Sequence, residues 1–291
     1  MKVLILGKGG QLSTELLATQ PKGIELCQWG RNDWDFLHPE EIKEPFKKLA
    51  PDVVINAAAY TGVDKAEEEK EKAEAINTVA VGAIAKACSE CHSRLLHVST
   101  DFVFDGKAGE AYLPTDPTNP LGVYGRTKLA GEREVMAALP KGGAVIRTSW
   151  LYSAHGNNFV KTMLKLMGEK DSLGVVSDQK GSPTWAKGLA MLLWKMTSNP
   201  SFSGIYHWCD AGVISWHDFS VVIQEEALKL GLIPREIPIR GIPTSEYPTL
   251  AQRPRFSALN CSTTVEEIGH QQEEWRKNLV SMLTLLKAER A

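Results

Sequence analysis

The stretch KVLILGKGGQL, residues 2–12, decides the fold. Its first part, residues 3–6, is a run of apolar residues ended by glycine, which predicts a short buried strand. After the glycines, apolar residues recur at helical spacing as far as Ala18. The stretch therefore predicts a strand, a tight glycine turn and a helix.

The same alternation continues along the chain. We expect strands at 24–29, 52–56, 94–98 and 144–147, and helices at 40–49, 65–87 and from Tyr124 onward. Strands that alternate with helices of about ten or more residues predict an α/β fold with a doubly wound, Rossmann-type parallel sheet. The ligand crevice of such a sheet lies at the carboxyl ends of its strands.

Beyond Trp150 the alternation loosens, and proline and glycine mark frequent turns. Helices are expected at 185–196, 216–230 and 275–287. A length of 291 residues favours one large domain and a smaller lobe. We expect residues 1–150 to form a dinucleotide-binding domain. Residues 151–291 are expected to form mainly a smaller, discontinuous α/β substrate-binding lobe, with parts of this later chain returning to the first domain.

The composition is that of a globular protein. Hydrophobic residues make up 43% of the chain and charged residues 23%, which argues against disorder. A formal net charge of -2 provides no basic field, so nucleic acid is not expected as a partner. The N-terminal apolar run is far shorter than a signal or membrane segment, so we expect a cytoplasmic protein without membrane attachment.

The cysteines suggest neither a disulfide framework nor a metal site. There are five, an odd number, and we expect reduced thiols. The sequence CSECH at 88–92 matches a haem attachment pattern, but it ends a helical run just before an apolar strand. We interpret it as a helix end. No second ligand pair stands at metal-site spacing, so no metal site is predicted.

The glycine turn is the first candidate binding element. Gly7 and Gly10 stand where the first strand meets the first helix, and Ser13 replaces the last glycine of the usual pattern. Glycines there let the backbone approach a pyrophosphate, and the helix N-terminus offers N–H groups to the anion. Any tight turn between a strand and a helix uses glycine. The turn alone therefore leaves open whether these glycines bind a dinucleotide or only form a tight turn.

The segments after the second and third strands suggest which dinucleotide would bind. The second strand ends in Trp29-Gly30-Arg31, with no acid for a ribose 2'-hydroxyl. Arg31 therefore favours NADPH, although a solvated loop arginine is the alternative. Asp35 and Phe36 could frame the adenine. The small residues Ala57, Ala58 and Ala59 would let a cofactor lie against the backbone, or would simply pack a helix on the sheet.

Tyr124 and Lys128 are the candidate proton-handling pair. Their i, i+4 spacing puts the phenol and the ammonium on one face of the predicted helix. A tyrosine active near neutral pH needs its pKa lowered by about 3 units, and a nearby cation in a poorly hydrated cleft supplies an effect of that order. Thr100 stands just past a strand end, where its hydroxyl can meet a substrate carbonyl. An exposed tyrosine–lysine pair is the alternative.

Together these motifs resemble the extended short-chain dehydrogenase/reductase family, in its dTDP-4-dehydrorhamnose reductase branch. The resemblance spans nearly the whole chain. It rests on GQL (10–12), NAAAYT (56–61), STDFVF (99–104), YGRTKLAGE (124–132), RTSW (147–150), GNNF (156–159) and Arg253-Pro254 with Ser257. The resemblance implies NAD(P)H-dependent reduction of the 4-keto group of dTDP-4-dehydro-L-rhamnose to dTDP-L-rhamnose, with NADPH preferred and NADH as the other option.

The resemblance also implies roles for single residues. Thr100 would hydrogen-bond the keto oxygen, Tyr124 would donate its proton, and Lys128 would hold the nicotinamide ribose and acidify the tyrosine. The residues implied in substrate binding are Thr100, Asp101, Tyr124, Trp150, Asn158, Phe159 and Arg253. The expected cofactor-binding residues are Gly7, Gly10, Gln11, Leu12, Arg31, Asp35, Phe36, Ala57, Ala58, Ala59, Tyr60, Thr61 and Lys128.

Three positions depart from related patterns. Sugar-nucleotide dehydratases carry a glutamate after the Thr-Asp pair, where this chain has Phe102, which argues against elimination. Some enzymes of the branch hold a bridging magnesium with two glutamates; Glu15 matches the first, but Lys187 stands at the second. We therefore expect no magnesium, and either a monomer or a homodimer. Ser13 is expected to loosen helix packing near the pyrophosphate.

Two alternatives stay open. The branch is similar to the regulatory subunit of methionine adenosyltransferase, so a non-catalytic nucleotide-binding subunit is one. Another NDP-4-keto-sugar reductase or epimerase is the second. Retention of Thr100, Tyr124 and Lys128 favours an enzyme, and the lack of an evident second base weakens the epimerase.

Overall fold

The fold is built around one parallel sheet. The computed structural model describes residues 1–290. Six strands pair in the order β10-β5-β4-β3-β1-β2, and every pairing is parallel. The strands are β1 (Lys2–Leu6), β2 (Glu25–Trp29), β3 (Val53–Asn56), β4 (Arg94–Thr100), β5 (Gly143–Thr148) and β10 (Gly204–His207). The predicted α/β doubly wound sheet is confirmed.

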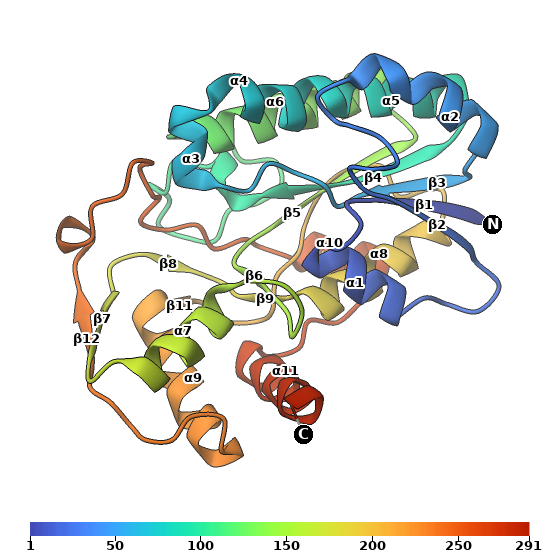
Figure 1. Ribbon diagram of the computed structural model, residues 1–291. Helices are drawn as coiled ribbons and strands as arrows, with labels where there is room; N and C mark the ends of the chain where they lie inside the picture. Colours follow the sequence, from blue (N-terminus) through green and yellow to red (C-terminus); the bar gives the residue numbers. More distant parts are fainter. Residues whose placement is uncertain (291) are drawn as a thin grey trace.

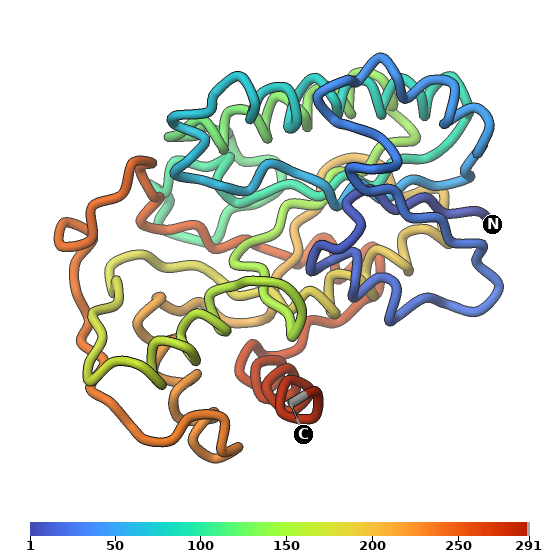
Figure 2. The backbone as a smooth tube through the Cα atoms, in the orientation of Figure 1, coloured from blue at the N-terminus to red at the C-terminus, as the bar shows by residue number. Residues whose placement is uncertain are grey.

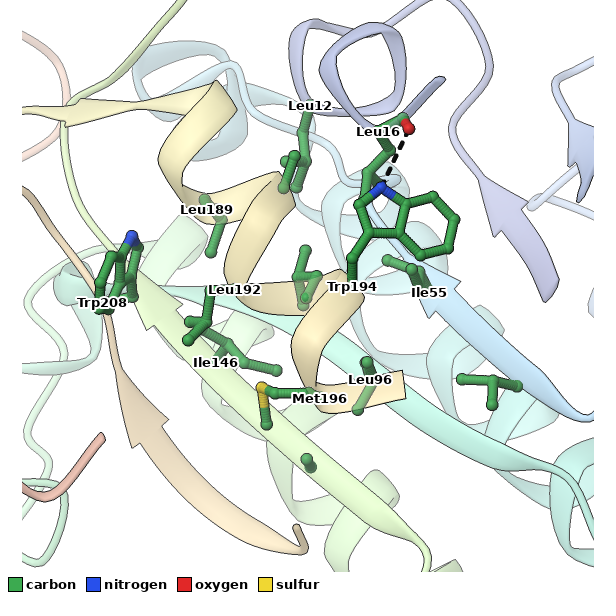
Figure 3. Packing of buried hydrophobic residues seen from close by; sticks show 14 of the residues in the cluster. Leu12, Leu16, Ile55, Leu96, Ile146, Leu189, Leu192, Trp194, Met196 and Trp208 are labelled. Carbon is green, nitrogen blue, oxygen red and sulfur yellow. Dashed lines mark hydrogen bonds between the residues drawn. The ribbon is translucent and has the colours of Figure 1, made fainter. Parts of the chain in front are cut away.

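Helices cover both faces of this sheet (Figure 1). On one side lie α2 (Lys43–Leu49), α5 (Ala80–Glu90) and α6 (Val123–Ala138), and on the other α1 (Gln11–Ala18), α8 (Ala186–Thr197) and α10 (Ser262–Ile268). The strands are apolar throughout because both faces are buried: Leu4 packs into one core and Val3 into the other. Figure 3 shows Leu189 and Leu192 of α8 against the sheet, and Trp194 Nε1 donating to Leu16 O at 3.1 Å.

The helical stretch expected at 65–87 is not one continuous helix. It divides into α3 (Val63–Glu68), α4 (Lys70–Glu74), a π-helical segment (Ala75–Val79) and α5. In the π-helical segment the Asn77 side chain donates to Tyr60 O and accepts from Tyr60 N, at 3.1 and 2.9 Å. The irregular turn thus anchors the loop after β3. Such π-helical turns inside helices are frequent at functional sites. The helix expected at 40–49 begins as a 3-10 turn (Pro39–Ile42) before α2.

The later chain forms the smaller lobe. Three two-stranded pairs join β6 (Leu151–Tyr152) to β9 (Thr184–Trp185), β7 (Leu173–Val176) to β12 (Ile239–Ile242), and β8 (Lys180–Gly181) to β11 (Ile214–Ser215). Its helices are α7 (Phe159–Glu169), α9 (Trp216–Leu230) and α11 (Trp275–Arg290). Helix α9 has the predicted bounds, whereas α7 was not predicted. These elements surround a separate apolar core that includes Phe219 and Leu283.

The later chain also returns to the sheet. Strand β10 pairs with β5 at the sheet edge. After β12 the chain runs past α3 and back to α10 (Figure 2), and on the way Ala251 N donates to Asp64 Oδ1 at 3.1 Å. The lobe is therefore discontinuous in sequence, as expected.

The five cysteines are free thiols. Cys88 is buried on α5, and burial raises the pKa of its thiol, while Cys91 follows the helix end. Within residues 1–290 no helix has both the length and the apolar character needed to cross a bilayer.

Candidate active site

The glycine turn forms a cradle at the carboxyl end of β1. Gly7 has a φ of 106°, and a Cβ there would lie 2.9 Å from Ala58 N, so only glycine fits. Gly9 has a φ of 84° and faces open space. Gly10 precedes α1, and no side chain caps that helix. The N–H groups of its first turn are thus left for an anion, which fits a dinucleotide pyrophosphate.

Ser13 strengthens this cradle. Its hydroxyl is buried and lies 2.8 Å from Gly7 O and 3.0 Å from Gly10 O, so it donates across the turn. The expectation that Ser13 loosens the packing is therefore wrong. A small hydroxyl fits where glycine was expected and adds a hydrogen bond that glycine cannot make.

A large cavity of about 1400 Å³ runs along the carboxyl edge of the sheet. We call it the large cavity. It brings together the glycine cradle, the ends of β2 to β5 and α6. Of the residues proposed from sequence, it is lined by Gly7, Gly10, Gln11, Leu12, Arg31, Asp35, Phe36, Ala57, Ala58, Ala59, Thr61, Thr100, Asp101, Tyr124, Lys128, Trp150, Phe159 and Arg253.

Two residues proposed from sequence do not line the large cavity. Tyr60 has the Lys72 ammonium 5.8 Å from its ring centroid and packs beside Gly62. Asn158 caps α7 by accepting from Lys161 N at 3.1 Å, and its amide donates to Gln11 Oε1 at 2.9 Å. The structure thus places the Asn158 side chain between the two lobes, while its neighbours line the large cavity.

The end of β2 shapes one end of the large cavity. Arg31 is exposed there. Asp33 Oδ2 accepts from Gly30 N at 2.8 Å, and Asp35 Oδ1 accepts from Leu37 N at 3.0 Å, so both acids are used by the loop backbone. Among the charged side chains of this loop, the arginine is the one that stays available.

Thr100 and Asp101 lie at the end of β4 and line the large cavity, in the region that we call the reaction centre. Strand β4 continues two residues beyond the predicted 94–98, so that Thr100 is its last residue. Its Oγ1 donates to Asp101 Oδ1 at 3.0 Å. Asp101 Oδ2 is buried and has no partner among residues 1–290. Burial raises the pKa of this carboxyl to about 6, and the nearby Ser257 and Thr100 hydroxyls oppose this shift.

Tyr124 lies beside Thr100 as the second residue of α6. Burial raises its pKa to about 12, the nearby Thr100 hydroxyl opposes this, and the Asp101 carboxyl adds to it. The lowering expected from Lys128 is therefore absent from the protein alone. The physical reason is that Lys128 directs its ammonium elsewhere, to Val98 O at 2.8 Å.

Lys128 is held by a buried histidine that the sequence did not single out. Its Nζ lies 3.3 Å from His97 Nε2, and His97 Nδ1 lies 3.1 Å from Asn56 Nδ2. Burial and the lysine charge hold the pKa of His97 well below its usual value, so the imidazole is neutral. Burial also lowers the pKa of Lys128 to about 8, against the Glu132 carboxylate. The signal for His97 was its place on β4, two residues before Ser99.

A buried ion pair supports the same strand end. The Arg147 guanidinium pairs with the Glu132 carboxylate, with Nη2 2.7 Å from Oε2, and both side chains are 2% exposed. Ser99 Oγ donates to Glu132 Oε1 at 2.5 Å. Helix α6 and strands β4 and β5 are thus joined directly beneath the reaction centre. The carboxylate stands one turn after Lys128, a spacing that the motif contained but that sequence reasoning did not use.

A second, apolar cavity of about 380 Å³ adjoins the large one. We call it the small cavity. Phe102, Trp150, Phe159, Trp216 and Arg253 line both cavities. Arg253 donates to Asp64 Oδ2 at 2.6 Å and lies 5.7 Å from the Phe102 ring centroid.

The two positions considered for a bridging magnesium each make another contact within this chain. Glu15 is buried and accepts from Ser153 Oγ at 2.7 Å. The Lys187 ammonium lies 5.2 Å from the Trp185 ring centroid. Within residues 1–290 no group of three or more His, Cys, Asp or Glu side chains could hold a metal ion.

The parallel sheet, its glycine cradle and the Thr100, Tyr124 and Lys128 cluster define an oxidoreductase of the short-chain dehydrogenase/reductase type. A family model described as RmlD substrate binding domain matches residues 1–288. The dTDP-4-dehydrorhamnose reductase of Salmonella typhimurium is 39% identical over 98% of this chain and 97% of its own length. That of Escherichia coli K12 is 40% identical over 98% of both chains. The chain belongs to the dTDP-4-dehydrorhamnose reductase family.

Solved structures agree with this assignment. A dTDP-4-dehydrorhamnose reductase from Clostridium acetobutylicum superposes with a TM-score of 0.92 at 36% identity, over 99% of this chain and 100% of that one. The Bacillus anthracis enzyme, in complex with NADP, has a TM-score of 0.91 at 31% identity, over 98% and 99%. A Thermotoga maritima UDP-glucose 4-epimerase, 11% identical with a TM-score of 0.82 over all of both chains, shares the fold alone.

Proposed function

We propose that this protein reduces the 4-keto group of dTDP-4-dehydro-L-rhamnose with NADPH and forms dTDP-L-rhamnose. The observation that carries the proposal is one cavity that holds both a pyrophosphate cradle and the hydroxyls of Thr100 and Tyr124. A carbonyl placed between these hydroxyls would have a hydrogen-bond donor and a proton donor within reach.

Tyr124 would donate the proton. With a pKa near 12, its phenol stays protonated at neutral pH, which a donor requires. Thr100 would hydrogen-bond the keto oxygen and orient it toward the phenol. As negative charge develops on that oxygen, the neighbouring hydroxyls stabilise it more strongly than they do the ketone.

Lys128 would hold the nicotinamide ribose. Val98 O and His97 fix its position, so little reorganisation is needed. The bound NADPH supplies the hydride. Phe102, which follows Asp101, cannot transfer protons, so the site favours reduction over elimination of water.

The cofactor assignment rests on Arg31, and the NADP bound to the Bacillus anthracis relative supports it. We expect Arg31→Ala to weaken NADPH binding by about tenfold and NADH binding by less than about twofold, because one exposed charge–phosphate contact is lost. Fluorescence titration of both dinucleotides measures this. An equal effect on the two would remove Arg31 from the 2'-phosphate.

Dinucleotide affinity should depend on pH through Lys128. Since its pKa lies at about 8, the ammonium is lost as the pH rises above that value. NADPH is an anion, so we expect its affinity to fall above pH 8 with a slope approaching about one decade per pH unit. Titrations between about pH 6.5 and 9.5 test this. Lys128→Met should flatten the slope, and an unchanged slope in that variant would contradict the assignment.

The sugar nucleotide would extend from the reaction centre into the small cavity. Asp101 Oδ2, buried and without a partner in the described part of the chain, would accept from a sugar hydroxyl. Trp150, Phe159 and Arg253 would line the path, while Asn158 and Tyr60 would act only through the loops that they hold. In this arrangement residues 1–150 mainly bind the dinucleotide and residues 151–291 mainly the substrate.

The test is NADPH consumption with dTDP-4-dehydro-L-rhamnose. We expect turnover that depends on both the sugar nucleotide and the dinucleotide. Tight dinucleotide binding without turnover above background would instead support a non-catalytic nucleotide-binding subunit. Faster turnover with another dTDP-4-keto sugar would change the substrate but leave the reductase.

A further inference from the structure

The Trp150 indole is held in place by several contacts. Its backbone φ is 47°, a left-handed conformation that a bulky residue adopts only when its surroundings impose it. Its ring stacks on that of Trp216, with centroids 3.5 Å apart and planes 11° from parallel. A Cβ added to Gly181 would lie 2.9 Å from Trp150 Cε2 and 3.0 Å from both Cζ2 and Nε1. Trp216 and Gly181 therefore both contact the indole closely.

Both contacts come from one small ladder in the smaller lobe. Strands β8 and β11 pair Gly181 with Ile214 and Lys180 with Ser215. Ser215 then caps α9 with a reciprocal capping box, and Trp216 is the first residue of that helix. The chain after β5 is tied to the same region, because Ser149 Oγ donates to Ser182 O at 2.6 Å. The ladder thus sets the position of the indole relative to the strand ends.

The stacked rings lie where the two cavities meet. Trp150 and Trp216 each line both the large and the small cavity. Phe159 extends the same aromatic surface, 4.5 Å from Trp216 between ring centroids. A ligand that reaches from Thr100 into the small cavity must therefore pass this surface.

We propose that Trp216 and Gly181 are specificity-determining positioning residues, which hold Trp150 as the wall between the two cavities and so select the 4-keto sugar by its substituents. The inference rests on the proposed function. Without Trp216 the indole would lose its stacking contact. The Trp150 side chain could then move, and sugars with a bulkier or differently oriented substituent would be accepted. The reacting hydroxyls of Thr100 and Tyr124 would stay in place, so binding and selectivity should change more than turnover.

Trp216→Leu removes the stack, and Trp275→Leu is its matched control. Trp275 is also half-buried, also begins a helix of the smaller lobe, and packs on Phe219 without lining either cavity. Trp216→Phe keeps an aromatic face. Gly181→Ala places a methyl group against the indole without backbone strain, since Gly181 does not have a left-handed φ. Loss of the exciton couplet of the stacked indoles in far-UV circular dichroism verifies the Trp216→Leu change.

The experiment measures kcat and KM for dTDP-4-dehydro-L-rhamnose and for a dTDP-4-keto sugar that differs at one carbon, together with calorimetric dTDP affinity. We expect Trp216→Leu and Gly181→Ala to raise KM by about tenfold, with kcat within about threefold, and to shift the kcat/KM ratio of the two sugars by about fivefold or more. Trp216→Phe should recover most of the ratio, and Trp275→Leu should leave it unchanged.

A ratio that moves no more in Trp216→Leu than in Trp275→Leu would overturn the proposal. If the wild type consumes no NADPH with either sugar, the proposed function fails instead. Calorimetry then tests the role of Trp216 independently of turnover. Weaker dTDP binding in Trp216→Leu but not in Trp275→Leu supports that role, and equal affinities contradict it.

Discussion

Replacing Tyr124 by phenylalanine should lower kcat by about 10²- to 10⁴-fold, the range that one positioned acid contributes. The phenol is the proton donor in the proposed reaction, and its pKa near 12 keeps the proton on it at neutral pH. Phenylalanine keeps the ring that meets Phe102 edge-on at 5.7 Å, so the local packing survives. The NADPH dissociation constant should therefore stay within about twofold of the wild type.

The matched control is Tyr112→Phe. The Tyr112 side chain is buried, and its ring stacks on Phe104 with centroids 4.0 Å apart. Its hydroxyl donates to Asp105, but Tyr112 lines neither cavity. Loss of the Tyr112 hydroxyl should lower the free energy of unfolding slightly and leave kcat unchanged. Stopped assays of both variants at saturating NADPH provide the comparison. If Tyr124→Phe turns over as fast as Tyr112→Phe, another group donates the proton.

Glu132→Leu should lower the free energy of unfolding by about 3–5 kcal/mol. The change leaves the Arg147 guanidinium buried beside Phe104 and His207 without its anion. His207 cannot replace it, because burial and Arg147 itself lower the pKa of His207 to about 3 and keep it neutral. Urea unfolding followed by circular dichroism measures the loss.

Two further variants separate charge burial from lost packing. Adding Arg147→Met to Glu132→Leu should recover most of the stability, because no unpaired charge remains. Glu273→Gln breaks an exposed pair with Lys277 on the surface and should change stability by less than about 1 kcal/mol. A double variant as unstable as Glu132→Leu alone would show that the effect is not electrostatic.

Much of the fold could be predicted because local pattern and tertiary role agree. In β1 and β3 the apolar runs reflect burial on both faces of a parallel sheet, and α9 has both a capping serine and a terminal Gly231 in the left-handed conformation. Helix α7 was missed because its start depends on Asn158 as a cap within a polar loop. The break between α3 and α5 could not be predicted because it depends on Asn77 bonding to a distant loop.

The site could be predicted where a motif names the reacting groups. Thr100, Tyr124 and Lys128 do lie in one cavity. The pKa values of Tyr124 and Lys128 could not be predicted from their spacing. The spacing does not indicate that the ammonium contacts Val98 O and His97 instead of the phenol. Ser13 was misjudged for a related reason: its hydroxyl bonds to the glycine turn only after that turn has folded. Trp216 gave no signal, since its importance arises from stacking on a residue 66 positions away.

The most direct test of the reductase account follows the hydrogen that reaches C4 of the sugar. Enzyme, dTDP-4-dehydro-L-rhamnose and NADPH with deuterium at both nicotinamide C4 positions are combined, and the product is examined by mass spectrometry and NMR. We predict dTDP-L-rhamnose with one deuterium on C4 per NADPH consumed, and no C4 deuterium when the label is in the solvent instead. Product labelled at C4 from solvent, or tight NADPH binding without any product, would contradict the account.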